Sequence, residues 1–380
     1  MKINFGEKKL GFGVMRLPML SGDVGDNGII DTEQTKKMFD EFIDRGFNYF
    51  DTAHGYIGGK SEKAVKECLT DRYKRDDYFL TNKLSGEFFT DEKDIIPLFE
   101  NQLETCGVSY FDLYLMHAIN GKNYYKFLDA NAFAIAARLR SEGKIRHIGI
   151  SYHDSPELLE KILTDHPEIE TVQIQFNYRD YEDAGIQSRA VWQTCVKFNK
   201  PVIVMEPVKG GKLAKLPYEA EKILSDAGNG SPASYAVRFA ASHKGVAMVL
   251  SGMSNLDQLR DNIGYMENFV PLFEKEKYAV QKAAQILASE YDTGCTACHY
   301  CAPVCPQKIK IPELLACLSS KRQYQNWNSD YYYSVNTSGG YGKASSCVRC
   351  GRCENVCPQN LKIRNLLDET AKEFEMNLSK

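Results

Sequence analysis

Short apolar runs alternate with amphipathic stretches over about the first 270 residues of the chain. Eight runs have the length and the β-branched or aromatic content of buried strands: Leu10–Met15, Asn48–Ala53, Tyr78–Leu84, Asp112–His117, His147–Tyr152, Thr171–Asn177, Pro201–Pro207 and Val246–Gly252. Helical spacing marks the stretches Thr32–Arg45, Ser61–Leu69, Asp94–Cys106, Ala132–Glu142, Pro156–Asp165, Ile186–Phe198, Ser231–Ser242 and Leu256–Phe269. Eight strand–helix units in this order predict an α/β fold, the (β/α)8 TIM barrel.

Two details refine this prediction. No G-x-G-x-x-G follows the first strand, which weakens the alternative of an open, doubly wound sheet that binds a dinucleotide. Before the first strand, Ile3–Phe5 and Lys8–Leu10 flank Gly6-Glu7, which predicts a small hairpin that plugs the bottom of the barrel.

Two copies of one cysteine pattern lie near the end of the chain. They are Cys295-x2-Cys298-x2-Cys301-x3-Cys305 and Cys347-x2-Cys350-x2-Cys353-x3-Cys357, each followed by a proline. Together they supply eight thiolates, the number that two [4Fe–4S] clusters need, and in this motif the fourth cysteine binds the other cluster. We therefore expect one cluster at Cys295, Cys298, Cys301 and Cys357, and a second at Cys347, Cys350, Cys353 and Cys305.

Zinc ribbons and disulfides are the alternatives to clusters. Zinc sites generally use two C-x2-C pairs separated by a longer stretch, whereas here four cysteines fall within eleven residues and the pattern is repeated. The remaining cysteines have no ligand spacing and are expected to be small buried side chains; they are Cys68, Cys106, Cys195 and Cys317.

Composition adds limits to this picture. The chain has 380 residues, of which 43% are hydrophobic and 26% charged, as in ordinary globular proteins. We expect a barrel over 1–270, a helical linker over 271–290 and a ferredoxin-like domain over 291–380. No apolar run is long enough to span a membrane, and a formal charge of −3 does not indicate a nucleic-acid-binding surface. Without a signal-peptide core at its start, and with oxidant-sensitive thiolates, the chain is expected in the cytoplasm.

Four polar residues fall at or just after the ends of predicted strands, where a barrel enzyme carries its active site. Asp51, Lys83 and His117 end the second, third and fourth strands, and Tyr56 lies in the loop after Asp51. Each has a simpler explanation by itself, because a strand-end Asp commonly caps the next helix and a loop Tyr commonly packs. Four groups of suitable chemistry at matching positions are harder to explain in this way.

The motifs around these residues resemble those of the aldo/keto reductase family. They are Gly11-Phe12-Gly13-Val14-Met15-Arg16-Leu17-Pro18, Asn48-Tyr49-Phe50-Asp51-Thr52-Ala53-x-x-Tyr56 followed by Gly59-Lys60-Ser61-Glu62, Thr81-Asn82-Lys83, and Asp112-Leu113-Tyr114-Leu115-Met116-His117. The resemblance implies a catalytic tetrad for carbonyl reduction or alcohol oxidation with NAD(P)H. In it, Tyr56 is the general acid, Lys83 and Asp51 form an ion pair that tunes it, and His117 orients the substrate carbonyl.

The chemistry of this tetrad is physically reasonable. A tyrosine titrates near 10 by itself, and a neighbouring ammonium group is expected to lower its pKa. The ammonium of Lys83 needs a partner to stay charged in a partly buried site, which Asp51 supplies. Negative charge that grows on the carbonyl oxygen would then be stabilised by Tyr56 and His117.

The resemblance also implies nucleotide contacts, with some departures from the family. Ser151 and Gln173 match positions that bind the carboxamide of nicotinamide, but Tyr152 replaces the usual asparagine and Met205 replaces the usual stacking aromatic residue. Glu206 stands where a small hydroxyl residue usually faces the pyrophosphate. The phosphate and adenine loop is matched by Gly252, Ser254, Gln258 and Asn262, although a plain helix N-cap at Ser254 or Asn255 is the alternative.

Basic residues that bind a 2′-phosphate in many members of the family are missing here, and Arg260 and Lys244 are out of register. NAD(P)H is therefore expected as a cofactor, without support for a preference for NADPH.

The 41 residues between Cys305 and Cys347 contain Tyr331-Tyr332-Tyr333, and we interpret them as a flap or docking surface on the barrel. The whole chain thus resembles an aldo/keto reductase fused to a two-cluster ferredoxin domain. Three functions are compatible with it. The first is a nicotinamide-linked oxidoreductase whose clusters are structural or exchange electrons with a ferredoxin or flavodoxin-type carrier. The second is a reductase that receives electrons directly from its clusters, with or without a flavin, and the third is a non-enzymatic electron carrier or docking protein. The first two would act on a small-molecule carbonyl or alcohol.

Overall fold

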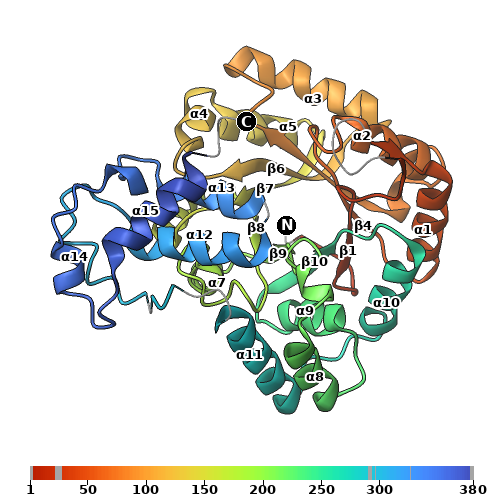
Figure 1. Ribbon diagram of the computed structural model, residues 1–380. Helices are drawn as coiled ribbons and strands as arrows, with labels where there is room; N and C mark the ends of the chain where they lie inside the picture. Colours follow the sequence, from red (N-terminus) through yellow and green to blue (C-terminus); the bar gives the residue numbers. More distant parts are fainter. Residues whose placement is uncertain (1–2, 22–27, 290–292, 296, 326, 377–380) are drawn as a thin grey trace.

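The computed structural model describes residues 3–21, 28–289, 293–295, 297–325 and 327–376. Its first part is a closed barrel of eight parallel strands in the order β1-β10-β9-β8-β7-β6-β5-β4 (Figure 1). The strands are β1 Leu10–Gly13, β4 Tyr49–Asp51, β5 Phe79–Ser85, β6 Phe111–Ile119, β7 Ile145–Tyr152, β8 Thr171–Gln175, β9 Val202–Met205 and β10 Val246–Ser251. The predicted fold class is confirmed, and each expected strand is present.

Helices surround the barrel, and several start where the sequence supplies a cap. Ser155 and Ser231 each accept a backbone hydrogen bond in the first turn, and a proline follows each of them. The outer helices are α1 Thr32–Asp44, α2 Lys60–Val65 with a π-helical turn Lys66–Thr70, α3 Glu92–Cys106, α5 Ala132–Ser141, α6 Pro156–Asp165, α7 Ser188–Lys197, α9 Pro232–Ala241 and α10 Leu256–Met266. Two further helices, α4 Tyr124–Asp129 and α8 Tyr218–Ala227, were not predicted.

The bottom of the barrel is closed by a side chain instead of a hairpin. Residues 3–9 contain no strand, so the predicted pairing of Ile3–Phe5 with Lys8–Leu10 is wrong. Phe5 nevertheless packs under the barrel, with its ring centroid 6.1 Å from that of Tyr49 and 5.8 Å from that of Phe79. The described residues contain one separate two-stranded sheet, β2 Met19–Ser21 with β3 Ile29–Ile30, after β1.

Two glycines in the barrel strands make room for the apolar side chains inside the barrel. A Cβ on Gly11 would lie 2.7 Å from Leu250 and 2.8 Å from Tyr49. A Cβ on Gly149 would lie 2.7 Å from Leu115. Larger residues at either position would displace the apolar layer below the strand ends.

The second part of the chain forms a separate lobe beside the barrel (Figure 1). Helix α11, Glu274–Ser289, packs on α8 and α9 and shares an apolar cluster with them. The lobe then contains α12 Ile311–Tyr324, α13 Trp327–Asn336, α14 Arg352–Asn355 and α15 Ile363–Phe374. Its core joins residues of α12, α13 and α15 with Cys301, Cys353 and the barrel residue Ile186.

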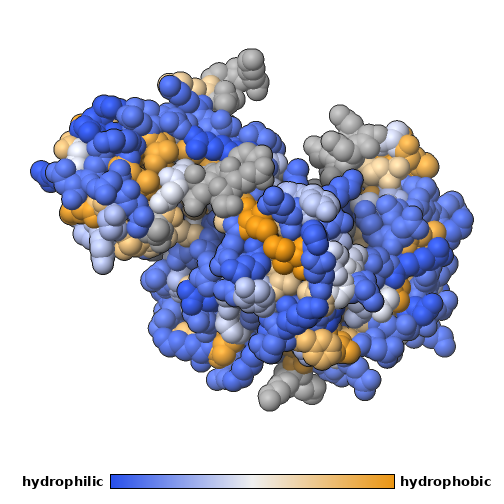
Figure 2. All heavy atoms as spheres, turned by 60° about the horizontal axis from the view of Figure 1, so that its bottom comes forward, coloured by the Kyte–Doolittle hydropathy of each residue, from blue (hydrophilic) through white to orange (hydrophobic). Residues whose placement is uncertain are grey.

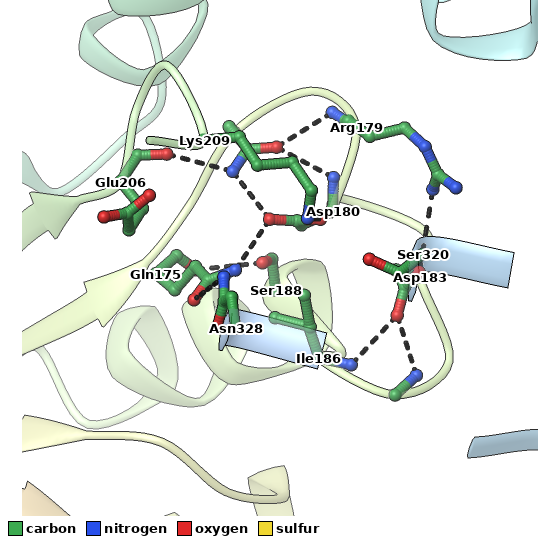
Figure 3. Close-up of polar contacts among 12 residues, drawn as sticks. Gln175, Arg179, Asp180, Asp183, Ile186, Ser188, Glu206, Lys209, Ser320 and Asn328 are labelled. Atoms are coloured by element: carbon green, nitrogen blue, oxygen red, sulfur yellow. Dashed lines mark hydrogen bonds and ion pairs between the residues drawn. The ribbon is translucent and has the colours of Figure 1, made fainter. Parts of the chain in front are cut away.

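Barrel and lobe meet over a buried polar network beyond the end of β8 (Figure 3). Asp180 accepts hydrogen bonds from Lys209 Nζ at 2.5 Å and from the amides of Gln175 and Asn177, each at 2.7 Å. The side chains of Asp180 and Lys209 are 0% and 2% exposed. Asn328 of α13 donates to Gln175 Oε1 at 3.2 Å. The lobe therefore helps to complete a network that encloses an ion pair.

A second ion pair lies beside the first. Arg179 is 3.6 Å from Asp183, and its Nε donates to Gln323 Oε1 of α12 at 3.3 Å. Burial raises the pKa of Asp183, and the carboxylate accepts the backbone N–H of Gly185 and Ile186 at the start of the following turn (Figure 3). The loop that follows β8 is thus bonded to Gln323 of α12 near its start and to the Asp183 carboxylate near its end.

The surface is mainly hydrophilic in the view of Figure 2, with scattered apolar side chains. None of the described helices is both long and apolar enough to cross a membrane.

Replacing Lys209 with Met should destabilise the protein, because Asp180 would keep a buried charge without its partner. We expect the free energy of unfolding to fall by about 3–5 kcal/mol, measured by urea unfolding of the anaerobic, cluster-loaded protein. Lys212→Met, at an exposed position nearby, is the matched control. A loss no larger than that of the control would contradict a structural role for the pair.

Candidate active site

The four tetrad residues predicted from the sequence lie together at the carboxyl ends of β4, β5 and β6. Lys83 Nζ is 2.5 Å from Asp51 Oδ1, 2.8 Å from the carbonyl oxygen of Thr52 and 3.3 Å from Tyr56 Oη. Lys83 is fully buried, whereas Tyr56 and His117 are partly exposed. The ammonium group therefore lies beneath two side chains that can reach a ligand.

Burial and charge act in opposite directions on these groups. Burial alone would lower the pKa of Lys83, but Asp51 and Tyr56 raise it above its usual value. Burial raises the pKa of Tyr56, and the expected lowering by Lys83 offsets only part of that rise. The prediction of a lowered tyrosine pKa is thus wrong in its net direction, because desolvation of the phenolate is the larger effect. Tyr56 keeps its proton at neutral pH.

His117 is held in a neutral state. Burial, together with the charge of Lys83, lowers its pKa well below the usual value. Ser85 Oγ lies 2.6 Å from His117 Nδ1, which leaves Nε2 for another partner. The rings of Tyr56 and His117 are 5.8 Å apart and nearly perpendicular. When Ser85 donates its hydroxyl proton, Nε2 carries the N–H of the neutral ring and can donate it to a substrate oxygen.

Ser85 was missed from the sequence, although a signal was available. It lies two residues after Lys83 on β5, and residues two apart point to the same face of a strand. Its hydroxyl can therefore reach the neighbouring strand end.

The residues expected to contact nicotinamide lie at the ends of the next three strands. Ser151 Oγ is buried and has no hydrogen-bond partner among the described residues, so it can satisfy a polar group of a ligand. Gln173 Nε2 donates to Asp51 Oδ2 at 3.0 Å and thereby supports the tetrad as well. Met205 is partly exposed at the end of β9. Tyr152 is buried, and its hydroxyl donates to the carbonyl of Ser155, away from these groups.

Glu206, which stands where a small hydroxyl residue usually faces the pyrophosphate, has a cationic partner. Arg16 Nη2 lies 3.2 Å from Glu206 Oε1, across the barrel mouth from the loop after β1. The charge of Arg16 also acts on Tyr56 in the direction that lowers its pKa. Sequence reasoning quoted Arg16 only as part of a motif, although its place just after a strand end is a position where barrels carry functional residues.

The expected phosphate loop is partly committed to internal hydrogen bonds. Asn255 caps α10 by accepting the N–H of Gln258 at 2.9 Å, which confirms the helix-cap alternative for that residue. Gln258 Oε1 accepts the N–H of Ser254 at 2.8 Å. Asn262 is buried and donates to Ser251 Oγ at 2.7 Å. A Cβ on Gly252 would lie 3.2 Å from Arg16, so the loop passes close to that side chain.

Helix α13 of the lobe reaches the rim of this site. Tyr331 Oη accepts a hydrogen bond from Asn120 Nδ2 at 3.1 Å, just beyond β6, and its ring lies 5.3 Å from that of His153. Burial lowers the pKa of His153 to about 4, and its Nδ1 is buried with no partner among the described residues. The Tyr331–Tyr333 segment therefore packs on the rim of the barrel, as expected.

The eight cysteines line two small cavities in the crossed combination. Cys295, Cys298, Cys301 and Cys357 surround one, and Cys347, Cys350, Cys353 and Cys305 surround the other. In the described part of the chain, no three His, Cys, Asp or Glu side chains converge as closely as a single metal ion requires. Four thiols around a wider space fit the ligand set of a [4Fe–4S] cluster in each cavity.

Other cysteines and cavities lie apart from these sites. Cys68, Cys106, Cys195 and Cys317 are buried, as expected. A cavity of about 750 Å³ lies between the loop after β8, α11 and Cys295, and none of the tetrad residues lines it.

Comparison with known proteins identifies the class of this chain. The profile of the aldo/keto reductase family matches residues 9–285, and that of the 4Fe-4S dicluster domain matches residues 294–362. The chain therefore belongs to the aldo/keto reductase family, is an oxidoreductase, and carries a 4Fe-4S dicluster domain.

Solved structures share the fold of the barrel, and one curated relative is similar over most of the chain. Aldo-keto reductase AKR11C1 from Bacillus halodurans, in its holo form, matches with a TM-score of 0.59 at 24% identity, over 72% of this chain and 91% of that one. A Klebsiella pneumoniae aldo-keto reductase in complex with NADPH matches with a TM-score of 0.58 at 19% identity, over 72% and 90% of the two chains. The uncharacterized oxidoreductase YqkF of Bacillus subtilis is 25% identical over 68% of this chain and 92% of its own length.

Other relatives match over shorter segments. The 4-dihydromethyl-trisporate dehydrogenase of Mucor mucedo is 37% identical over 93 residues, which cover 23% of this chain and 28% of that relative.

Cys305→Ala should damage the cluster whose other ligands are Cys347, Cys350 and Cys353, because the cavity around those residues includes Cys305. We expect electron paramagnetic resonance of the reduced, anaerobically purified variant to lose one of two cluster signals. Cys317→Ala, a buried cysteine outside both cavities, is the control. Selective loss of the cluster at Cys295, Cys298 and Cys301 would refute the crossed assignment, and zinc in place of iron would refute the cluster sites.

Proposed function

We propose that this chain reduces a carbonyl group, or oxidises an alcohol, with a nicotinamide cofactor at the tetrad, while its clusters exchange single electrons with an external carrier. The observation that carries the proposal is the position of the Lys83 ammonium group. It lies 2.5 Å from Asp51 Oδ1 and 3.3 Å from the hydroxyl of Tyr56, whose side chain is partly exposed. This arrangement supplies a proton donor together with a fixed positive charge beside it.

The protein's part in the reaction concerns charge on the substrate oxygen. The nicotinamide, when bound, supplies the hydride. Tyr56 would give its proton to the carbonyl oxygen as negative charge grows there, and its raised pKa keeps that proton available at neutral pH. Lys83 would stabilise the phenolate that remains, because its ammonium group lies next to the phenol oxygen. The neutral His117 would donate an N–H to the same substrate oxygen and so fix the direction of the carbonyl.

Several residues would hold the cofactor. Ser151 and Gln173 would bind the carboxamide, and the support for Ser151 is its unpartnered, buried hydroxyl. Met205 would offer a polarizable contact to the ring. Gly252, Ser254 and Gln258 would lie along the phosphates, where Arg16 would offset the charge of Glu206. Asn262 would act on this loop through Ser251, to which its side chain is bonded.

The substrate would enter between the strand ends and α13. Tyr331 lies at the rim next to His153, on the His117 side of the mouth, and both side chains are partly exposed. Small-molecule carbonyl compounds or alcohols that fit between these rings and Tyr56 would be the substrates.

The second part of the proposal is that the clusters exchange electrons with an external carrier. Each cluster passes one electron at a time, so a ferredoxin or flavodoxin-type carrier is the natural partner of this domain. A second candidate function has the clusters feed electrons directly to the barrel site. The contact between α13 and the barrel rim favours it, because α13 shares its core with Cys301 and Cys353. Clusters of this kind are expected to work in a reducing compartment such as the cytoplasm.

Tyr56→Phe keeps the ring and removes the proton that must reach the substrate oxygen. We expect kcat for carbonyl reduction to fall by roughly two to four orders of magnitude, with normal cluster content. Lys83→Met should cause similar damage, and the double variant should be little worse than either single variant, because the two groups act as a unit. Steady-state kinetics with NADH or NADPH and a panel of aldehydes and ketones tests this. Near-native turnover by Tyr56→Phe would favour cluster-fed chemistry instead.

We expect the preference between NADH and NADPH to depend on the lack of a free cation that could bind a 2′-phosphate. Arg260 is engaged with Glu41 at 3.0 and 3.1 Å, and Gln258 is neutral, so neither offers a free cation for a 2′-phosphate. NADH should bind at least as tightly as NADPH, and Gln258→Arg should shift the ratio of the two Kd values toward NADPH. Fluorescence titration of cluster-loaded protein measures both. Gln258→Leu is the control, and a clear native preference for NADPH would contradict the assignment of this loop.

A further inference from the structure

Positive charge is concentrated in the two chain segments that carry the cysteine motifs of the lobe. Residues 297–310 and 343–364 contain seven Lys or Arg and a single Glu, although the whole chain has a formal charge of −3. The cations are Lys308, Lys310, Lys343, Arg349, Arg352, Lys362 and Arg364. The remainder of the chain is therefore clearly acidic, so this concentration is a local feature of the lobe.

Four of these seven cations are exposed and form no ion pair with a carboxylate in the described part of the chain. Arg349 pairs with Asp368, and Arg364 pairs with Glu354. Lys308, Lys343, Arg352 and Lys362 are exposed and form no ion pair with any acid in the described part of the chain. Exposed lysines elsewhere in the described part of the chain also lack an ion pair, as Lys37 and Lys63 do, so the feature of this group is its position around the cysteine motifs. The seven cations outnumber the acids of the two segments, and they would leave a positive potential on this face even beside the negative charge of two thiolate-bound clusters.

The unpaired cations lie around the cluster cavities. Lys308 and Arg352 each adjoin residues that line the cavity of Cys347, Cys350, Cys353 and Cys305. Lys362 lies between two residues that line the other cavity. Lys343 is brought close to Lys308 by the hydrogen bond from the N–H of Gly342 to the Lys308 carbonyl oxygen. We call Lys308, Lys343, Arg352 and Lys362 the cationic collar.

Apolar side chains are exposed within the same segments. Val348 and Val356 are 57% and 38% exposed and flank Cys350, and each cluster site has one exposed ligand, Cys350 in one and Cys298 in the other. The helix that carries Arg352, α14, lies at the side of the lobe away from the barrel (Figure 1). Apolar atoms show among hydrophilic ones on this lobe in Figure 2 as well. An apolar centre within a charged rim is the usual anatomy of a transient protein interface.

We infer that the cationic collar docks an acidic one-electron carrier protein, and that electrons pass at the cluster of Cys347, Cys350, Cys353 and Cys305. In the step itself one electron leaves the carrier's reduced centre and enters this cluster, so the carrier is oxidised by one equivalent and the cluster is reduced by one. No bond forms or breaks, and no proton moves. The inference rests on the proposed exchange with an external carrier, and it assigns the surface, the charge of the partner and the cluster that receives the electron.

Electrostatic docking of this kind explains the arrangement physically. Complementary charge raises the association rate and orients the partner, while a small apolar contact lets it leave after transfer. An exposed ligand at the interface shortens the distance between the two redox centres. The acidic remainder of the chain would repel the same partner and direct it to the lobe.

Binding to a purified acidic ferredoxin, measured by isothermal titration at low salt, tests the inference without any substrate turnover. The variant Lys308→Glu/Lys343→Glu reverses two charges of the collar, and we expect its Kd to rise about tenfold or more. Lys37→Glu/Lys63→Glu makes the same change in charge at exposed positions on α1 and α2 and should leave Kd unchanged. Wild-type binding should weaken as salt is raised, since exposed charges are screened. Iron content and cluster absorbance of each variant confirm that the lobe is intact.

Three outcomes would overturn the inference: equal loss of affinity in both double variants, binding that does not respond to salt, or equally tight binding of a basic c-type cytochrome or of a DNA oligonucleotide. NADH-dependent and NADPH-dependent carbonyl reduction is measured separately on the same samples. Failure of that activity with collar-dependent carrier binding would refute the reductase proposal alone. Intact activity without carrier binding would refute the docking surface alone.

Discussion

A buried ammonium group is the constraint on which the barrel site depends. Lys83 is fully enclosed at the carboxyl ends of the strands, where a charge without partners would be very unfavourable. Asp51, the carbonyl of Thr52 and the hydroxyl of Tyr56 all face it, and Gln173 fixes the second oxygen of Asp51. The ends of β4, β5 and β8 are thus tied to one cation, so the geometry needed for proton donation is also the geometry that makes burial of Lys83 tolerable.

Enclosure of the site also explains why its two ring groups keep their functional protonation states. Desolvation raises the pKa of Tyr56 and lowers that of His117, so the phenol remains a proton donor and the imidazole remains neutral. The charge of Lys83 opposes the first shift and adds to the second. One cation therefore acts differently on two neighbours, because one of them ionises to an anion and the other to a cation.

The lobe is joined to the barrel through polar groups as well as through Ile186 in its apolar core. Asp180 with Lys209, and Arg179 with Asp183, are enclosed where α12 and α13 cover the loop after β8 (Figure 3). Both ion pairs join barrel residues, and the lobe contacts them through Asn328, which donates to Gln175, and Gln323, which accepts from Arg179. Tyr331 contacts Asn120 at the rim of the barrel site, on a helix whose core includes two cluster cysteines. The state of the lobe and the shape of the barrel mouth are therefore physically linked.

The sequence by itself determined what depends on local pattern. Periodicity predicted the eight strands, spacing predicted the crossed grouping of the cysteines that the cavities reproduce, and strand-end positions predicted Asp51, Lys83 and His117. It failed for the hairpin at Ile3–Phe5, because a single buried side chain can close a barrel without strand pairing. Contacts between residues far apart in the chain were decided only by the tertiary structure, as for Arg16 with Glu206 and Tyr331 with Asn120. The pKa of Tyr56 was decided there too, because burial raises it by more than the charge of Lys83 lowers it. These depend on how elements pack in three dimensions, and no local pattern of residues encodes that packing.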